Sequence, residues 1–157
     1  MPPGEEGKIS IKLDTNGRGG RELKKYITVF TNDSKNPKPK LIIYGNVEKF
    51  VNIEPPSVSL RGYVGETMQK EVRIIPREKY PFKIVTSNAQ YGKDILFQIN
   101  ENKIGEATEY LLKVKNIKKE KGVYRDKIIL QTNSEIKPTL KISVYLKILE
   151  REQENRN

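Results

Sequence analysis

Apolar residues alternate with polar ones along most of the chain, and this period of two constrains the fold more than any other feature. Ile9, Ile11 and Leu13 are separated by polar residues, and similar short runs recur as far as residue 149. Successive side chains of a β-strand point to opposite faces, so the pattern predicts half-buried strands. No segment shows the sustained period of 3.6 residues that is typical of an amphipathic helix. The sequence therefore predicts an all-β protein.

Turn-forming residues divide the chain into short expected strands. The first 50 residues contain about three, over residues 9–13, around Ile27 and Val29, and over 41–47. Seven or eight more are expected after them. Their ranges are 51–53, 57–60, 70–75, 82–86, 95–99, 110–114, 124–131 and 140–149. Of these, 95–99 and 51–53 are the candidate edge strands.

An internal repeat sets the domain organisation. When the chain is shifted by 101 residues, Thr31-Asn32 falls on Thr132-Asn133 and Pro37 falls on Pro138, without a gap. The apolar phase is kept through three expected strands and their turns. Shared alternation alone could be accidental in two β segments, but shared polar turn residues at one offset favour true repetition.

The repeat distance of about 100 residues is the size of an immunoglobulin-like domain. We therefore interpret residues 51–149 as one complete immunoglobulin-like β-sandwich. Residues 1–50 correspond to the C-terminal half of a sister module, with about three strands. Residues 150–157 are wholly polar and are expected to form a tail. The half-module suggests that the chain belongs to a longer tandem protein.

The segment from Gly7 to Val47 resembles a bacterial family of unknown function. The similarity lies in a strand ending at Thr31-Asn32-Asp33, a proline turn at Pro37 and a strand ending at Gly45-Asn46-Val47. The second module keeps the pattern loosely. It departs at Ser134 and Leu146. The resemblance implies immunoglobulin-like sandwich domains, akin to Hydin-type and major-sperm-protein-type domains, in exported periplasmic or envelope-associated proteins. Its motifs are strands and turns, so it implies no activity.

Composition excludes several kinds of chemistry. The sequence has no His, Cys or Trp. Zinc sites built from His and Cys, Ser-His-Asp triads and thiol chemistry are therefore absent. The carboxylates are scattered over expected loops and exposed strand positions. The loop from Asn16 to Gly20 is rich in glycine, but no helix follows it to bind a phosphate. We expect no enzyme, no cofactor and no metal site.

The chain is basic, with 30 Lys and Arg against 20 Asp and Glu. Residues 1–50 hold ten basic and six acidic residues, so the excess is shared by both modules. We expect no aromatic residues beside the lysine clusters, because the tyrosines and phenylalanines lie mainly in strand phase, as core residues would. We therefore expect no specific nucleic-acid binding. The charged run 114–121 is either a solvated loop or a recognition loop. The surface candidates in and beside it are Lys113, Lys115, Lys118, Lys119 and Lys121.

These patterns favour a non-catalytic structural or protein-interaction module of a tandem-repeat cell-envelope protein. Its partner would be another protein or its own sister modules, bound through an edge strand. The alternative is an adhesion module that binds anionic envelope polymers or surfaces through the lysine clusters. The apolar side of residues 8–47 needs cover, either by docking on the second module or in a dimer. No apolar run is long enough to cross a membrane, and the first residues do not have the pattern of a signal peptide.

Overall fold

The computed structural model describes residues 6–105 and 107–151, and within them it contains ten β-strands and no helix. The strands form three open sheets of two, four and four strands. The chain divides into two units, Met1–Lys49 and Phe50–Asn157, which are described separately. The all-β prediction is therefore confirmed. In the described residues no helix is long and apolar enough to span a membrane.

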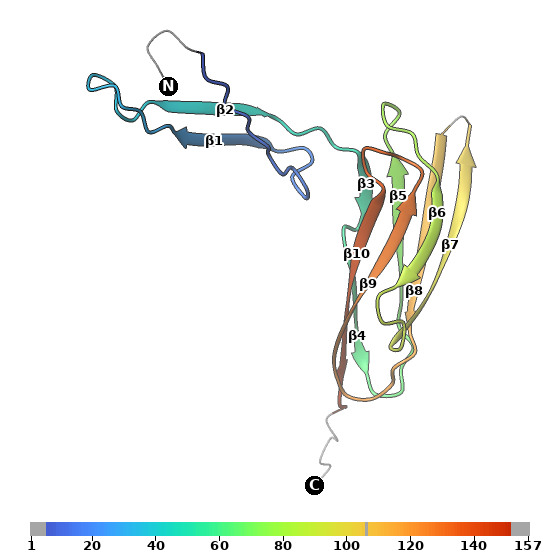
Figure 1. Ribbon diagram of the computed structural model, residues 1–157. Coiled ribbons are helices and arrows are strands. Elements are labelled where there is room, and N and C mark those ends of the chain that lie inside the picture. Colours follow the sequence, from blue (N-terminus) through green and yellow to red (C-terminus); the bar gives the residue numbers. More distant parts are fainter. Residues whose placement is uncertain (1–5, 106, 152–157) are drawn as a thin grey trace. The chain divides into compact units, whose positions relative to one another are not determined.

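The first unit is an antiparallel hairpin of β1 (Glu22–Thr28) and β2 (Lys40–Asn46) (Figure 1). Its ladder continues toward the turn through a hydrogen bond from Val29 N to Pro39 O at 2.9 Å. Of the hydrophobic residues on β1 and β2, Leu23 alone is fully buried. One face of the hairpin carries Leu23, Ile27, Leu41 and Ile43. This face is only partly covered in the described chain.

The expectation of three strands in residues 1–50 is wrong, because Ile9, Ile11 and Leu13 lie in irregular chain. At an offset of 101 this segment corresponds to β8 (Ala107–Asn116), which pairs with a strand on each side. No strand among the described residues of the first unit offers such neighbours, and backbone ladders need partners. Ile9 and Ile11 consequently remain 57% and 41% exposed, although the sequence predicts them to be buried.

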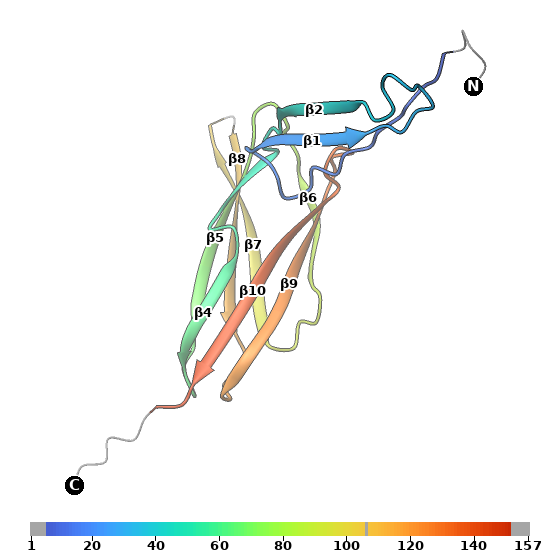
Figure 2. The ribbon, with the colours of Figure 1, turned by 90° about the vertical axis from the view of Figure 1, so that its left-hand side faces the viewer.

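The second unit contains two four-stranded sheets, and all eight strands expected after residue 50 are present. One sheet has the order β4-β10-β9-β6 and the other β3-β5-β8-β7. Figure 2 shows β4 and β10 running in the same direction, and this is the parallel pair. The strands not yet delimited are β3 (Val51–Glu54), β4 (Val58–Tyr63), β5 (Gln69–Pro76), β6 (Ile84–Ala89), β7 (Ile95–Ile104), β9 (Gly122–Thr132) and β10 (Thr139–Leu149).

The inward faces of these two sheets form one hydrophobic core. Alternate residues of β10 are buried, from Leu140 to Ile148, and they meet buried residues of β5 and β8 such as Ile74 and Leu112. At one end Phe82 stacks between Phe50 and Tyr110. The apolar residues of the period-two pattern are therefore the ones that face the core. Burial of their apolar surface is the main contribution to the stability of the second unit.

The boundaries of two expected segments change. Residues 114–116 belong to β8, so only 117–121 form the loop that follows it. At the C-terminus, Lys121 Nζ pairs with Glu150 at 2.7 Å and Arg151 pairs with Glu66 at 2.7 Å. Glu150 and Arg151 therefore contact the second unit instead of forming a free tail. The rest of the expected tail, 152–157, lies outside the described residues.

The hairpins β1–β2 and β9–β10 have the same register at an offset of 101. Ile27 faces Leu41 in the first, and Ile128 faces Ile142 in the second. Their turns also match. Thr31 Oγ1 donates a hydrogen bond to Asn36 O at 2.7 Å, and Thr132 Oγ1 donates one to Lys137 O at 2.6 Å. The repeated Thr-Asn pairs thus have a structural role, because the threonine hydroxyl holds each turn.

Tyr124 fixes the start of β9. Its hydroxyl lies 3.2 Å from Glu120 O and 3.3 Å from Lys121 O, so it donates to the backbone of the preceding loop. A Cβ on Gly122 would lie 2.8 Å from this hydroxyl and 2.9 Å from the ring. Glycine at 122 therefore leaves room for the tyrosine ring to turn back over its own loop.

We expect Tyr124→Phe to destabilise the second unit by about 1 kcal/mol, the usual net contribution of a hydrogen bond. Chemical denaturation monitored by circular dichroism measures the change. Tyr145→Phe is the matched control, because Tyr145 is exposed on the neighbouring strand. Equal stability of the two variants would show that the hydroxyl of Tyr124 does not hold the loop.

Candidate functional site

The five candidate lysines do not form one free basic cluster. Lys113 and Lys115 lie on β8, and the other three lie in the loop after it. Lys113 Nζ pairs with Glu71 at 3.0 Å, and Lys118 Nζ pairs with Glu120 at 2.8 Å. Lys121 pairs with Glu150, as described above. Most of this positive charge is therefore used within the second unit.

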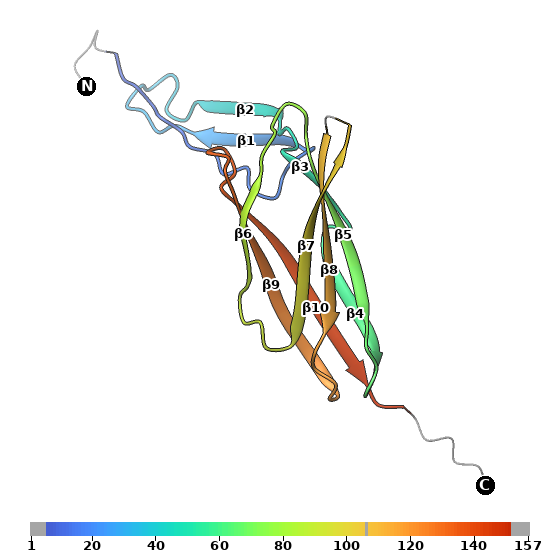
Figure 3. The same ribbon diagram turned by 90° about the vertical axis from the view of Figure 1, so that its right-hand side faces the viewer.

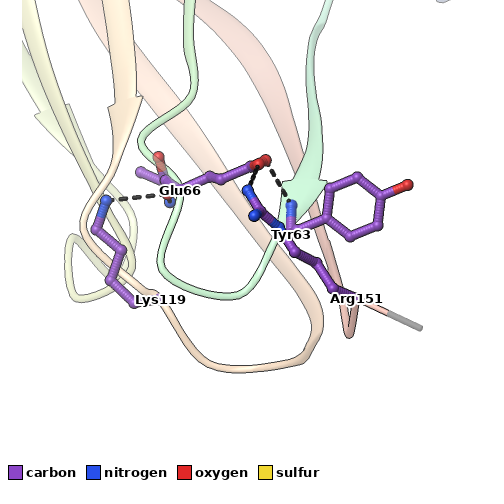
Figure 4. A network of polar contacts seen from close by, with 5 residues as sticks. Tyr63, Glu66, Lys119 and Arg151 are labelled. Atoms are coloured by element: carbon purple, nitrogen blue, oxygen red, sulfur yellow. Dashed lines mark hydrogen bonds and ion pairs between the residues drawn. The ribbon is translucent and has the colours of Figure 1, made fainter. Parts of the chain in front are cut away.

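Lys119 belongs to a network that joins the loop after β8 to the loop between β4 and β5 (Figure 4). Its Nζ donates to Glu66 O at 2.9 Å and also to the hydroxyl of Thr67. The Glu66 carboxylate accepts hydrogen bonds from Tyr63 N at 2.8 Å and from Arg151 at 2.7 Å. The backbone hydrogen bond from Tyr63 and the contact with Arg151 hold the pKa of Glu66 below its usual value.

Asn116 lies at the centre of the same two loops, and it is 3% exposed. Its Nδ2 donates to Glu66 O at 3.0 Å and to Lys118 O at 2.7 Å, while its Oδ1 accepts from Met68 N at 2.6 Å. Every hydrogen-bonding group of this amide except one lone pair is matched. The network of Asn116, Lys119 and Glu66 is therefore a structural clamp between loops.

The described residues bring together no group of three or more Asp and Glu side chains that could hold a metal ion. Tyr110 is buried, and burial raises the pKa of its phenol. Its hydroxyl donates to Phe82 O at 3.4 Å and accepts from Ile84 N at 3.3 Å. This tyrosine is a core residue whose hydroxyl is bonded to backbone groups.

The strand β7 is the most open backbone edge of the second unit. The sheet order β3-β5-β8-β7 confirms that both expected edge strands, 51–53 and 95–99, lie at sheet edges. Figure 3 shows β7 beside β8, with which it pairs in unbroken register over ten residues. From Ile95 to Asn100 it has no charge and no proline. These are the features of a strand that accepts another strand.

The other edges of the second unit are protected. The strand β3 has four residues and is followed by Pro55-Pro56. The strand β4 has six residues and leads into Gly65, where φ is +85°. The strand β6 has a register shift between Ile84 and Thr86. Short strands and irregularities of this kind discourage pairing between chains.

A shallow hollow lies on the sheet surface beside β7. Leu96 and Gln98 of β7 and Lys113 and Lys115 of β8 line it together with Gln69 of β5. Leu96 faces Lys115 across the two strands, and Gln98 faces Lys113. The hollow thus combines an exposed apolar side chain with two ammonium groups. Of the five predicted lysines, Lys113 and Lys115 are the two that the structure places beside an open edge.

Sequence reasoning missed a second exposed surface, on the first unit. The aromatic residues in general lie in strand phase, as core residues would, but Tyr26, Phe30 and Tyr44 are 62%, 74% and 75% exposed. Tyr26 and Tyr44 share one face of the hairpin with Ile42. A signal that could have found Tyr26 and Phe30 is the offset of 101 residues, because the positions 101 residues later carry Lys127 and Gln131.

Comparisons with known proteins give a structural similarity and no family. No family profile matches the chain, and no curated protein matches it. Among solved structures, the chain is similar to a protein of unknown function from Porphyromonas gingivalis W83. The identity is 13%, the TM-score is 0.48, and the match covers 83% of this chain and 67% of that chain. The resemblance to an immunoglobulin-like bacterial family therefore stays a prediction.

A pH dependence follows from the ion pair of Arg73 with Glu109. The Arg73 guanidinium donates two hydrogen bonds to this carboxylate and lowers the pKa of Glu109 from 4.5. Because the folded-state pKa is lowered, the pair stabilises the fold above pH 4.5, and this contribution is lost as pH falls further. We expect Glu109→Gln to lower the melting temperature at pH 7, and the difference from wild type to shrink toward pH 3.

Glu71→Gln is the matched control for this thermal series, since Glu71 pairs with Lys113 on the same two strands but is far more exposed. Its melting temperature at pH 7 should stay close to wild type. A pH-independent difference between Glu109→Gln and wild type would contradict the role of the ionised carboxylate.

Proposed function

We propose that the protein is a non-catalytic protein-interaction module, and that the edge strand β7 accepts an extended segment of a partner. The single observation that carries this proposal is the open, uncharged and regular edge from Ile95 to Asn100. Backbone hydrogen bonds along β7 would supply affinity. The hollow beside it, with Leu96, Lys113 and Lys115, would select side chains.

We propose further that the second unit is an immunoglobulin-like β-sandwich. An immunoglobulin domain of the constant type has strands A, B, E and D in one sheet and C, F and G in the other. The orders β3-β5-β8-β7 and β10-β9-β6 have this arrangement, with β4 as a continuation of the first strand. Tyr124 supports the proposal, because it starts the sixth strand of this series and bonds back to Glu120 and Lys121. The tyrosine corner of immunoglobulin domains has the same geometry.

The first unit is proposed to be the last part of a sister module. The equal register of β1–β2 and β9–β10 supports this proposal, and so does the shared turn at Thr31 and Thr132. Repetition of modules favours an architectural protein in which successive domains present similar surfaces. By its resemblance, we propose that the parent protein is exported to the periplasm or the cell envelope.

The alternative function is adhesion to anionic envelope polymers through the five lysines. Lys113, Lys118 and Lys121 have carboxylate partners within the unit, and Lys119 is bonded to the loop of Glu66. Lys115 and Lys119 have no ion pair with a described residue, and of these two only Lys119 makes side-chain hydrogen bonds there. The lysines around the loop after β8 therefore favour the interaction module over this alternative.

The partner of β7 is expected to be an extended segment with an acidic side chain that meets Lys115. We expect a library of random seven-residue peptides, screened against the full chain, to yield alternating apolar and acidic sequences. Gln98→Glu should abolish their binding, because a charge at a sheet edge opposes strand addition and a carboxylate there repels the acidic side chains of the peptide. Ser143→Glu is the matched control, since it adds the same charge to the outer face of the central strand β10. Fluorescence anisotropy with a selected peptide measures both.

Raising the salt concentration separates this function from the alternative. Strand addition should weaken only slightly with salt, whereas binding through lysines alone should weaken steeply. Equal binding of a selected peptide to Gln98→Glu and to Ser143→Glu would contradict the proposal for β7. Failure of the library to yield any peptide that binds would contradict it as well.

A further inference from the structure

The outer face of the hairpin β1–β2 carries aromatic rings and lysines without a carboxylate between them. Lys24 faces Tyr44, and Tyr26 faces Ile42. One step further toward the turn, Thr28 faces Lys40. Beyond β1, the hydrogen bonds from Val29 N to Pro39 O and from Thr31 N to Pro37 O continue the ladder. The face therefore extends as far as Phe30 and Lys38.

The rings on this face are open to solvent, as the exposures of Tyr26, Phe30 and Tyr44 show. Ile42 beside them is 53% exposed. Single exposed apolar residues are ordinary on protein surfaces, but a contiguous group marks an interaction site. Lys24 Nζ lies 5.5 Å from the centre of the Tyr26 ring, and Lys38 Nζ lies 5.5 Å from that of Phe30. The ammonium groups thus stay beside the rings.

The hairpin β9–β10 provides an internal comparison, because it has the same register. At its corresponding positions, Lys127, Gln131 and Ser143 replace Tyr26, Phe30 and Ile42, while Tyr145 corresponds to Tyr44. Residues of this kind suffice for the outer face of such a hairpin. Folding alone therefore does not require Tyr26, Phe30 or Ile42 on this face, and their exposure favours a role in binding.

We infer that this outer face binds a linear acidic polysaccharide. Aromatic rings have an electron-rich face, on which the C–H groups of a sugar ring pack well. Ile42 can pack against the same apolar sugar faces, and the hydroxyls of Tyr26 and Tyr44 can bond to sugar hydroxyls. Lys24, Lys38 and Lys40 would pair with the carboxylates of the polymer.

Charge and arrangement favour this ligand over two others. A second copy of the chain that docked through the outer face of either hairpin would bring lysines against lysines, because neither hairpin has a carboxylate on that face between the strand ends. A nucleic acid carries a phosphate at every nucleotide, whereas the central row of Tyr26 and Ile42 has no positive charge. A polymer with an uncharged stretch between two carboxylates matches the uncharged pair of Tyr26 and Ile42, which lies between Lys24 and Lys40. This face and the edge strand β7 use different residues, so either proposal can fail alone.

Two polysaccharides serve as probes: hyaluronan, with a carboxylate on every second sugar, and polygalacturonate, with one on every sugar. Isothermal titration calorimetry on the full chain should show binding of at least one of them, weakening as salt is raised. Dextran, which is neutral, should bind more weakly. Replacing Lys24, Lys38 and Lys40 by Gln should remove the salt dependence and most of the affinity.

The decisive variant exchanges two of the rings and Ile42 for the residues of the second hairpin, Tyr26→Lys, Phe30→Gln and Ile42→Ser together. It adds one positive charge, so attraction by charge alone predicts equal or tighter binding. Loss of two ring contacts predicts weakening by about tenfold or more, since a loss of about 1.4 kcal/mol of binding free energy is a factor of ten in affinity. Backbone amide NMR shifts of β1 and β2 verify that the hairpin still forms. Unchanged or tighter binding of a polysaccharide by this variant would overturn the proposal.

The charge control is placed on the second unit. Arg125→Gln, Lys127→Gln and Lys141→Gln together remove three positive charges from the outer face of β9 and β10. This variant should bind the polysaccharide as wild type does. An equal loss in this variant would show diffuse attraction instead of a site. Tighter binding of an oligothymidylate or of phosphatidylglycerol vesicles than of either polysaccharide would also overturn the proposal, in favour of those ligands.

Discussion

The antiparallel pairing of β9 with β10 is the interaction on which the second unit depends. These strands lie at the centre of their sheet, where β10 also pairs with β4 and β9 also pairs with β6. Their inward side chains, among them Ile128 and Ile142, are fully buried against the opposite sheet. The register of this pair decides which residues face the core, because a slip of one residue would turn every side chain over. The bonded turn at Thr132 and the hydroxyl of Tyr124 hold the two ends of β9.

The same hairpin occurs in the first unit without that environment. β1 and β2 keep the register and the turn, so local pairing and the threonine hydroxyl are enough to form them. Without an opposite sheet among the described residues, Leu41 stays exposed where its counterpart Ile142 is buried. Lys25 stands where the second unit has Asp126, which accepts hydrogen bonds from Tyr91 N and Gly92 N. The two hairpins thus share a backbone but differ in what their faces contact.

Strand positions in the second unit were predictable from the sequence because they depend on local patterns. All eight strands after residue 50 follow from alternation and turn residues, and both edge strands were identified. The strand expected at Ile9 is absent from the structure. A strand needs neighbouring strands to pair with, and alternation in the sequence does not show whether they are present. The lysine cluster was overestimated for a similar reason: the carboxylates of Glu71 and Glu150 approach it from distant strands. Exposure of Tyr26 and Phe30 also depends on which face is covered, and strand phase alone does not distinguish the two faces.

Recognition in this protein is proposed to rest on an open strand edge and an open sheet face, both made from regular backbone. The open edge of β7 is the more central of these two features. Amide hydrogen exchange of the free chain, measured residue by residue, tests it directly. An open edge on β7 predicts that amides directed at β8 exchange slowly while the alternate amides, directed outward, exchange fast between Ile95 and Ile104. Uniform slow exchange along this strand would show that its edge is already covered, and would contradict a role for β7 in binding a partner.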